Sequence, residues 1–154
     1  ASFVLSGPRG ERVVAADGFF LGMYSTLLEA DEILTQIRVP VPAPGSGWSY
    51  QKLKRKTGDF ATAATAVMLQ MKGGNVASVS IALTNVGATA LKAQAAEASL
   101  IGKPLNDATV NEAARLAMGI CEPSADQRGD VAYKTAMCGE MTRRALLAAR
   151  SRAK

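Results

Sequence analysis

Three stretches in the N-terminal third of the chain have the pattern of β-strands, and hydrophobic and polar residues alternate along the third of them. These stretches are residues 2–5, 11–16 and 33–39. A Gly-Pro-Arg-Gly segment at 7–10 separates the first two and predicts a tight turn, because glycine tolerates positive φ and proline pre-sets a turn conformation. The pattern therefore predicts a β-hairpin followed by a third strand.

The segment between the hairpin and the third strand predicts two local features. Asp17 is placed to cap a short helical turn over residues 19–21. An acidic cluster in the connector is expected to be solvated, and it consists of Glu29, Asp31 and Glu32. Within the strand 33–39, alternation places Ile33, Thr35, Ile37 and Val39 on one face, and Leu34 is the lone apolar side chain on the other.

Residues 40–47 contain three prolines and two glycines, which no regular strand or helix tolerates, so we place a domain boundary after residue 45. Beyond it, three stretches predict strands, and the breaks between them contain glycine. The stretches are 48–56, 60–72 and 76–85. Short glycine-containing connections favour antiparallel neighbours, so the pattern predicts a three-stranded antiparallel meander.

After about residue 91 the hydrophobic period changes from 2 to 3.6, which indicates helices. The predicted helices cover 93–101, 106–120 with Asn106 or Asp107 as the cap, and a long C-terminal segment from about Asp130. The predicted fold class is α+β, with a hairpin and strand, a proline-rich joint, a three-stranded sheet and three helices.

Composition narrows the chemistry that this chain can perform. It has 154 residues, 18 Lys and Arg against 13 Asp and Glu, a net charge of +5, and no histidine. The absence of histidine excludes Ser–His or Cys–His nucleophiles and any zinc site that uses histidine. Two cysteines, Cys121 and Cys138, are too few for a disulfide scaffold or a four-cysteine cluster. We therefore expect free thiols, no metal site, no catalytic residue and a cytoplasmic location.

The densest charged feature is the basic run of Lys52, Lys54, Arg55 and Lys56. One interpretation is the solvated face of an edge strand, and a second is a nucleic-acid-binding surface, which the positive charge permits. A third is that one lysine faces an anionic cofactor while its neighbours face water. Strand alternation would place Lys52, Lys54 and Lys56 on one face.

Four segments together resemble the flavoprotein (medium) subunit of molybdenum hydroxylases, and most closely the carbon monoxide dehydrogenase branch. They are DGFFLGMYSTLL at 17–28, DEILTQIRVP at 31–40, GWSYQKLKRKTGDFATAA at 47–64, and the stretch from IALTNVG at 81–87 to RRAL at 143–146. The third segment is the most specific of the four. The resemblance extends over nearly the whole chain.

The resemblance implies a domain assignment that agrees with the patterns above. Residues 1–45 correspond to the end of an FAD-binding region, and residues 46–154 to a C-terminal domain with a three-stranded antiparallel sheet and a three-helix bundle. The two glycine-rich loops that hold the FAD pyrophosphate in this family have no counterpart in these 154 residues. FAD binding is therefore implied for the intact subunit, and this segment alone is expected to be inactive.

The resemblance also implies the function. In this family, electrons pass from a molybdenum cofactor in a large subunit through two [2Fe–2S] clusters in a small subunit to FAD, and then to an external acceptor. The residues that match cofactor contacts are Leu34, Lys52 and, with a role in the turn as the alternative, Asp59. Carbon monoxide is the first expectation for the substrate, with aldehydes and N-heterocycles as alternatives. The competing interpretation is a basic module that binds nucleic acid or protein and has no enzymatic activity.

Overall fold

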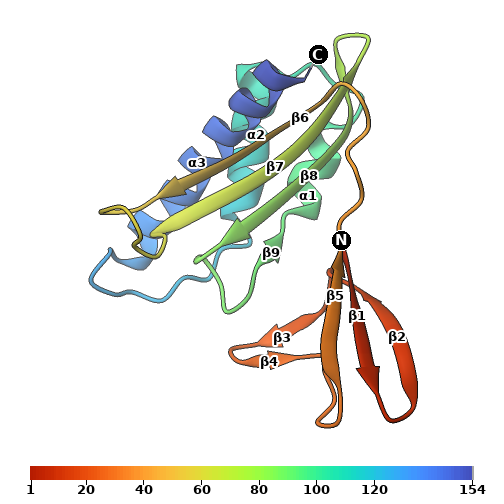
Figure 1. Cartoon of the computed structure of the whole chain (residues 1–154). Helices are drawn as coiled ribbons and strands as arrows, with labels where there is room; N and C mark the ends of the chain where they lie inside the picture. Colours follow the sequence, from red (N-terminus) through yellow and green to blue (C-terminus); the bar gives the residue numbers. More distant parts are fainter. Residues whose placement is uncertain (154) are drawn as a thin grey trace. The chain divides into compact units, whose positions relative to one another are not determined.

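The chain divides into two compact units, Ala1–Pro42 and Ala43–Lys154. The division lies inside the proline-rich stretch 40–47. The structure is a computed structural model that describes residues 1–153 (Figure 1).

The first unit contains a three-stranded antiparallel sheet. Strand β1 (Ser2–Gly7) lies in the centre, between β2 (Gly10–Ala15) and β5 (Ile33–Arg38). Gly10 closes the β1–β2 turn at φ +106°, a conformation that favours glycine. The predicted hairpin and third strand are therefore confirmed.

The predicted helical turn after Asp17 is wrong. Residues 20–26 form a small hairpin instead, in which β3 (Phe20–Gly22) pairs with β4 (Ser25–Thr26). The Phe19 ring is buried, 4.3 Å from the ring centre of Phe3, and the Phe19 carbonyl accepts a hydrogen bond from the N–H of Leu27 at 3.0 Å. Packing of Phe19 into the small core of this unit thus outweighs the local capping preference of Asp17.

The second unit is a twisted antiparallel sheet covered by helices. Its strands follow the order β6 (Ser46–Leu53), β7 (Ala63–Lys72), β8 (Asn75–Thr84) and β9 (Leu91–Lys92). The antiparallel pairing of the three long strands is confirmed, and the two-residue β9 adds a fourth. Gly73 and Gly74 form the β7–β8 turn with φ of +58° and +82°, as a two-residue hairpin loop of this handedness requires.

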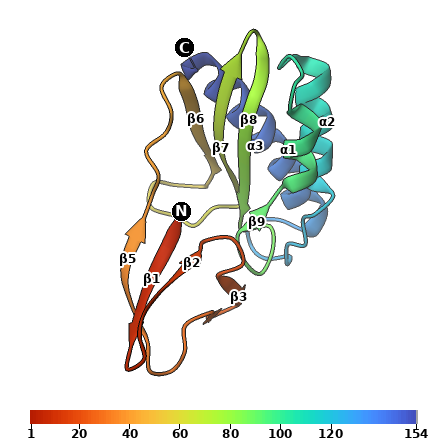
Figure 2. The same ribbon diagram turned by 90° about the vertical axis from the view of Figure 1, so that its right-hand side faces the viewer.

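All three helices lie on one face of this sheet and leave the other face open (Figure 2). They are α1 (Gln94–Leu100), α2 (Asp107–Met118) and α3 (Val131–Arg152). Helix α2 begins at a capping box, in which the Asn106 side chain accepts from the N–H of Thr109 and the Thr109 hydroxyl accepts from the N–H of Asn106, both at 3.0 Å. Helix α3 begins where Asp130 accepts from the N–H of Tyr133 at 2.7 Å. Both predicted N-termini and the α+β fold class are confirmed.

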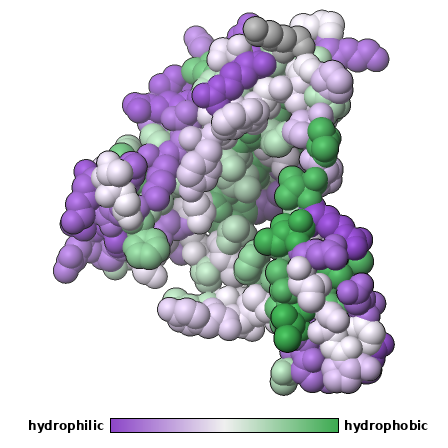
Figure 3. Space-filling view, in the orientation of Figure 1, coloured by the Kyte–Doolittle hydropathy of each residue, from purple (hydrophilic) through white to green (hydrophobic). Residues whose placement is uncertain are grey.

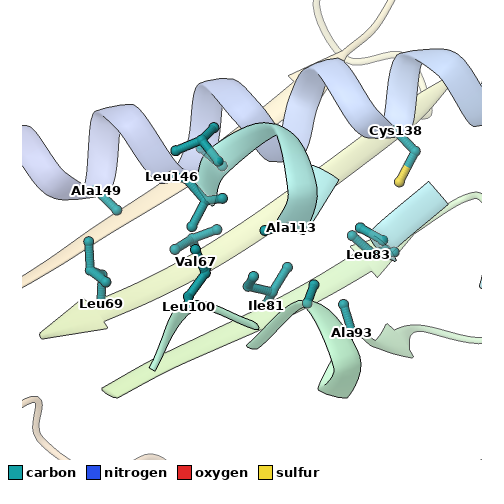
Figure 4. Close-up of a cluster of buried hydrophobic side chains, with 14 of the residues drawn as sticks. Val67, Leu69, Ile81, Leu83, Ala93, Leu100, Ala113, Cys138, Leu146 and Ala149 are labelled. Atoms are coloured by element: carbon teal, nitrogen blue, oxygen red, sulfur yellow. The ribbon is translucent and has the colours of Figure 1, made fainter. Parts of the chain in front are cut away.

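The core of the second unit fills the space between sheet and helices (Figure 4). Leu146 of α3 points toward the sheet, and Val67, Leu69, Ile81 and Leu83 point back from β7 and β8. The remainder of this core consists largely of alanines, which allow helices and sheet to approach closely. One polar pair lies in the same layer, because the hydroxyls of Thr65 and Thr142 share a hydrogen bond of 3.1 Å and satisfy each other.

Strand β6 approaches the end of α3 closely at Gly47. A Cβ atom at residue 47 would lie 1.9 Å from the carbonyl oxygen of Ala149 and 2.6 Å from the backbone nitrogen of Ala153. Neither backbone atom can move aside without displacing the helix. Gly47 therefore fixes the distance between strand and helix.

Replacing Gly47 with alanine is expected to lower the free energy of unfolding by at least about 2 kcal/mol, because overpacking against backbone forces the helix away from the sheet. Chemical denaturation followed by circular dichroism measures this change. The matched control is Gly119→Ala, where the new Cβ would meet its nearest atom at 3.4 Å, an ordinary contact. Equal stability of Gly47→Ala and Gly119→Ala would contradict this account of the packing.

Candidate cofactor-binding site

Lys52 projects from the open face of the second unit's sheet. Strand β6 alternates, so that Gly47 and Ser49 are buried on the helix side while Trp48, Tyr50 and Lys52 are exposed on the opposite side. Across the strand pair, Lys52 lies opposite Ala64 of β7, which is itself fully buried. Within residues 1–153 the Lys52 ammonium forms no salt bridge, and it is therefore available to an anionic group.

The prediction that Lys52, Lys54 and Lys56 share one face of a strand is wrong. Strand β6 ends at Leu53, so Lys54, Arg55 and Lys56 lie in the β6–β7 loop, where strand alternation no longer applies. Arg55 is engaged there, since its Nε donates to Asp59 at 3.1 Å. Among the four basic residues, Lys52 alone belongs to the rigid sheet.

Trp48 anchors the beginning of the same strand. The guanidinium of Arg152, in the last turn of α3, lies 4.7 Å from the centre of the Trp48 ring, a cation–π contact. The same guanidinium donates to the Trp48 carbonyl oxygen at 2.7 Å. The sequence shows Trp48 and the basic helix end but not their contact, because 104 residues separate them.

Asp59 is held by neighbouring cations rather than left free. Its carboxylate accepts from Arg55 at 3.1 Å, from the N–H of Phe60 at 2.9 Å and from Arg128 at 3.3 Å. Only 10% of the Asp59 side chain is exposed. The hydrogen bond from Arg55, and then that from Arg128, hold the pKa of Asp59 below its usual value. These contacts favour the turn role that was the alternative for this residue.

Leu34 lies in the first unit, and its surroundings differ from the prediction. A β-bulge at Thr35 interrupts the alternation, so that Leu34 pairs with Leu5 and Ile37 pairs with Phe3. Phe3 and Leu5 are two residues apart on β1 and share one face, which places Leu34 and Ile37 on the same side of the sheet. Leu34 is therefore not the lone apolar residue on its face, because Ile37 lies on the same side. The Leu34 side chain is half-buried against the core of this unit.

Within the acidic connector, Glu29 and Asp31 are exposed as expected, whereas Glu32 is not solvated. The carboxylate of Glu32 is almost fully buried and accepts two hydrogen bonds from Arg12, at 2.6 and 2.7 Å, and one from the N–H of Glu29 at 2.9 Å. Arg9 pairs with Asp31 at 3.1 Å and with Glu29. The bidentate contact from Arg12, followed by the Glu29 N–H, lowers the pKa of Glu32 to about 2. These pairs fix the connector that leads into β5.

Cys121 and Cys138 are both free thiols in the structure. Cys138 is fully buried in the core of the second unit, whereas Cys121 is half-buried and its thiol donates to the Ala117 carbonyl at 3.3 Å. The neighbouring Cys121 sulfur and burial together raise the pKa of Cys138. Across residues 1–153, no three acidic, histidine or cysteine side chains gather in a metal-binding arrangement.

None of the helices in the described part of the chain is long and apolar enough to cross a membrane.

Residues 48–149 match the family model of the CO dehydrogenase flavoprotein C-terminal domain. The chain belongs to this family. The match begins at Trp48 and includes Lys52, Asp59 and Arg128, so the open face and the β6–β7 loop lie inside the family's domain.

Curated relatives and solved structures extend the similarity beyond the family domain. The chain is 55% identical over 152 residues to the carbon monoxide dehydrogenase medium chain of Hydrogenophaga pseudoflava. The aligned region covers 99% of this chain and 53% of that protein. It is 48% identical over 154 residues to the carbon monoxide dehydrogenase medium chain of Afipia carboxidovorans, and the aligned region covers 100% of this chain and 54% of that protein. A solved carbon monoxide dehydrogenase from Hydrogenophaga pseudoflava superimposes with a TM-score of 0.98 at 57% identity, covering 99% of this chain and 53% of that one.

The chain thus spans about half the length of the curated relatives that it matches. The similarity supports the flavoprotein interpretation, and it gives no support to the alternative of a basic binding module without activity.

We expect the stability of the first unit to fall in acid because of Glu32. Its folded-state pKa of about 2 lies below the ordinary value of 4.5, so the carboxylate stabilises the fold above about pH 4.5 and this contribution disappears as the pH falls toward 2. Arg12→Met should remove much of this pH dependence, whereas Arg38→Met, which loses only a contact to Gln36, should keep it. Amide exchange of residues 1–42 between pH 2 and 5 measures the difference, and identical profiles for the two variants would contradict the assignment.

The two thiols should differ in reactivity. A disulfide reagent is expected to label Cys121 in the native protein and Cys138 only after unfolding, because Cys138 is completely buried and its pKa is raised. Mass spectrometry of the labelled peptides identifies the site. Rapid labelling of Cys138 in the folded protein would show that this part of the core opens.

Proposed function

We propose that this chain is the C-terminal half of the flavoprotein subunit of a molybdenum hydroxylase of the carbon monoxide dehydrogenase type. In this role the intact subunit takes electrons from [2Fe–2S] clusters into FAD and passes them to an external acceptor. The observation that carries the proposal is the 55% identity over 152 residues to a carbon monoxide dehydrogenase medium chain, which extends through both units.

The proposal assigns residues 1–45 to the end of the FAD-binding region. The first unit exposes many large apolar side chains, and hydrophobic residues are visible on its surface (Figure 3). Those more than half exposed include Val13, Ile33, Ile37, Val39 and Val41 on or beside the three-stranded sheet, and Leu21, Met23 and Tyr24 in the β3–β4 hairpin. The side chains of the three-stranded sheet lie on both of its faces. Exposed apolar surface of this kind is typical of surface that other protein covers, which here would be the rest of the FAD-binding region.

Lys52 fits the cofactor that the proposal requires. FAD carries an anionic pyrophosphate, and its isoalloxazine ring becomes anionic when it is reduced. An exposed lysine without a salt bridge in residues 1–153, on a rigid strand, can bind either group and stabilise its negative charge. FAD supplies the redox chemistry, and the role of Lys52 is to favour the reduced, charged state.

Leu34 and Asp59 have different parts in the proposal. Leu34 offers a half-buried apolar surface on β5, suited to contact with a ring system. Asp59 is already occupied by Arg55, Arg128 and a backbone N–H, so we assign it an organising role in the loop that follows Lys52. None of the three is assigned to bond making or bond breaking, since substrate oxidation is expected at the molybdenum cofactor of a partner subunit.

The proposed partners are a large subunit with the molybdenum cofactor and a small subunit with the iron–sulfur clusters, without nucleic acid. A solved relative is described as a Cu,Mo-CO dehydrogenase, and this chain is 47% identical to it. Carbon monoxide is therefore the proposed substrate of the assembly, ahead of aldehydes and N-heterocycles. A cytoplasmic location is part of the same proposal, and the two unpaired thiols support it, because reducing compartments keep thiols free.

Replacing Lys52 with methionine in the full-length subunit, within its assembly, should weaken FAD retention about tenfold or more, since hydrogen bonds to charged groups contribute roughly 1.5–3 kcal/mol. It should also lower the flavin midpoint potential, because a cation that favours the anionic reduced flavin is lost. Flavin absorbance after dialysis and a redox titration measure the two effects.

The matched control is Lys54→Met, which removes the same charge two residues away in the loop. It should leave both quantities unchanged. Equal, negligible effects of Lys52→Met and Lys54→Met would mean that Lys52 is an ordinary surface lysine.

A further inference from the structure

The β6–β7 loop, residues 54–62, follows Lys52 almost directly and is held at both of its ends. At its base the N–H of Thr62 donates to the carbonyl of Leu53 at 2.8 Å. The side chain of Asn85, a residue with φ of +62°, donates to the carbonyls of Ala61 and Thr62. The middle of the loop depends on a different contact.

That contact is the ion pair between Asp59 and Arg128. The Arg128 Nη2 atom donates to Asp59 Oδ1 at 3.3 Å, and its guanidinium lies 6.0 Å from the centre of the Phe60 ring. Asp59 also pairs with Arg55, but Arg55 belongs to the same loop and cannot fasten it to anything else. Within residues 1–153, Arg128 is the residue whose salt bridge joins this loop to a distant part of the chain.

Arg128 is itself held firmly in the linker between α2 and α3. Its backbone N–H donates to Asp126 at 2.8 Å, and its Nη1 atom pairs with the other Asp126 oxygen at 3.3 Å. Asp126 is bound in turn by Lys134 at 2.9 Å, and Lys134 donates to the Ser124 carbonyl at 2.7 Å. Only 3% of the Lys134 side chain is exposed, so the far end of this chain of charges is buried in the fold.

The buried position of Arg128 leaves one of its own donors unpaired. Its Nε atom is buried and has no hydrogen-bond partner, alone among the side-chain nitrogen and oxygen atoms of the described residues. Leaving a buried donor unpaired is unfavourable. The contacts of the guanidinium to Asp59, Asp126 and Phe60 offset this cost.

We propose that Arg128 is a positioning residue for the cofactor site: by holding Asp59, it fixes the middle of the β6–β7 loop, which directly follows the strand that carries Lys52. This inference rests on the proposed function for its link to the flavin, and on the ion-pair geometry alone for the loop. It assigns a functional role to the α2–α3 linker, which otherwise only connects two helices.

The loop itself provides a probe, because Lys54, Arg55 and Lys56 are three consecutive trypsin sites. In the purified assembly, Arg128→Met and Asp59→Asn should each speed cleavage at 54–56 roughly tenfold, the effect of losing one charged hydrogen bond. The double variant should be cleaved no faster than the faster single variant, since both remove the same contact. Arg128→Lys should restore part of the protection.

The matched control is Arg115→Met, which removes an arginine from an exposed pair with Glu112 on α2 and should leave cleavage of the loop unchanged. Unchanged cleavage in Arg128→Met and Asp59→Asn would overturn the loop clamp. Additive acceleration in the double variant would show that the two residues act separately, which also overturns it.

The link to the flavin is tested in the same variants by redox titration. Arg128→Met should shift the flavin midpoint potential in the same direction as Lys52→Met, and adding it to Lys52→Met should produce no further shift. If the double variant shifted the potential by the sum of the two single shifts, Arg128 would not act through Lys52, even if the cleavage rates show that it holds the loop. A wild-type assembly without flavin would overturn the proposed function and the flavin link together, while the cleavage rates would still decide whether Arg128 holds the loop.

Discussion

The close contact between β6 and the end of α3 is the constraint on which the second unit depends. Because Gly47 lies against the α3 backbone, the side of β6 that faces the helices is fixed. Strand alternation then directs Trp48, Tyr50 and Lys52 to the open face. The orientation of the proposed cofactor-binding lysine therefore follows from a glycine five residues earlier. The contact of Arg152 with Trp48 holds the same strand at its beginning.

Ion pairs in this chain mainly organise connecting segments. Arg12 and Glu32 fix the connector before β5, and Arg128 with Asp59 fixes the loop after β6. Isolated exposed pairs contribute little to stability, but both of these involve carboxylates that are at most 10% exposed, where screening by water is weaker. Each pair lies next to a strand that carries a proposed cofactor contact, Leu34 on β5 or Lys52 on β6. The charges thus position the connecting segments beside these strands rather than perform chemistry.

Much of the fold could be predicted from the sequence because local signals and tertiary structure agree. Glycine pairs at turns, Asn106 and Asp130 at helix starts, and the change of hydrophobic period after residue 91 each specify an element directly. Three features escaped prediction for physical reasons. Phe19 is drawn into a core that sequence periodicity does not reveal, the bulge at Thr35 reverses the alternation around Leu34, and β6 ends before the basic run does.

In the proposed site, too, residues marked by a local sequence motif could be predicted, whereas contacts between distant parts of the chain could not. Lys52 was identified from its position in a specific motif, and the structure places it on an exposed, rigid strand. Arg128 was missed because it lies in an irregular linker, 69 residues from Asp59 in sequence, and no local pattern marks that contact. Long-range pairs of this kind become visible only when the chain is folded.

A cryo-EM map of the native assembly that contains this chain tests the central claim most directly. The account predicts a flavin in the intact subunit, with one of its anionic or carbonyl oxygens within hydrogen-bond distance of the Lys52 Nζ atom. A map without flavin in this subunit, or with the flavin away from the open face of β6 and Lys52 surrounded by solvent, would contradict it.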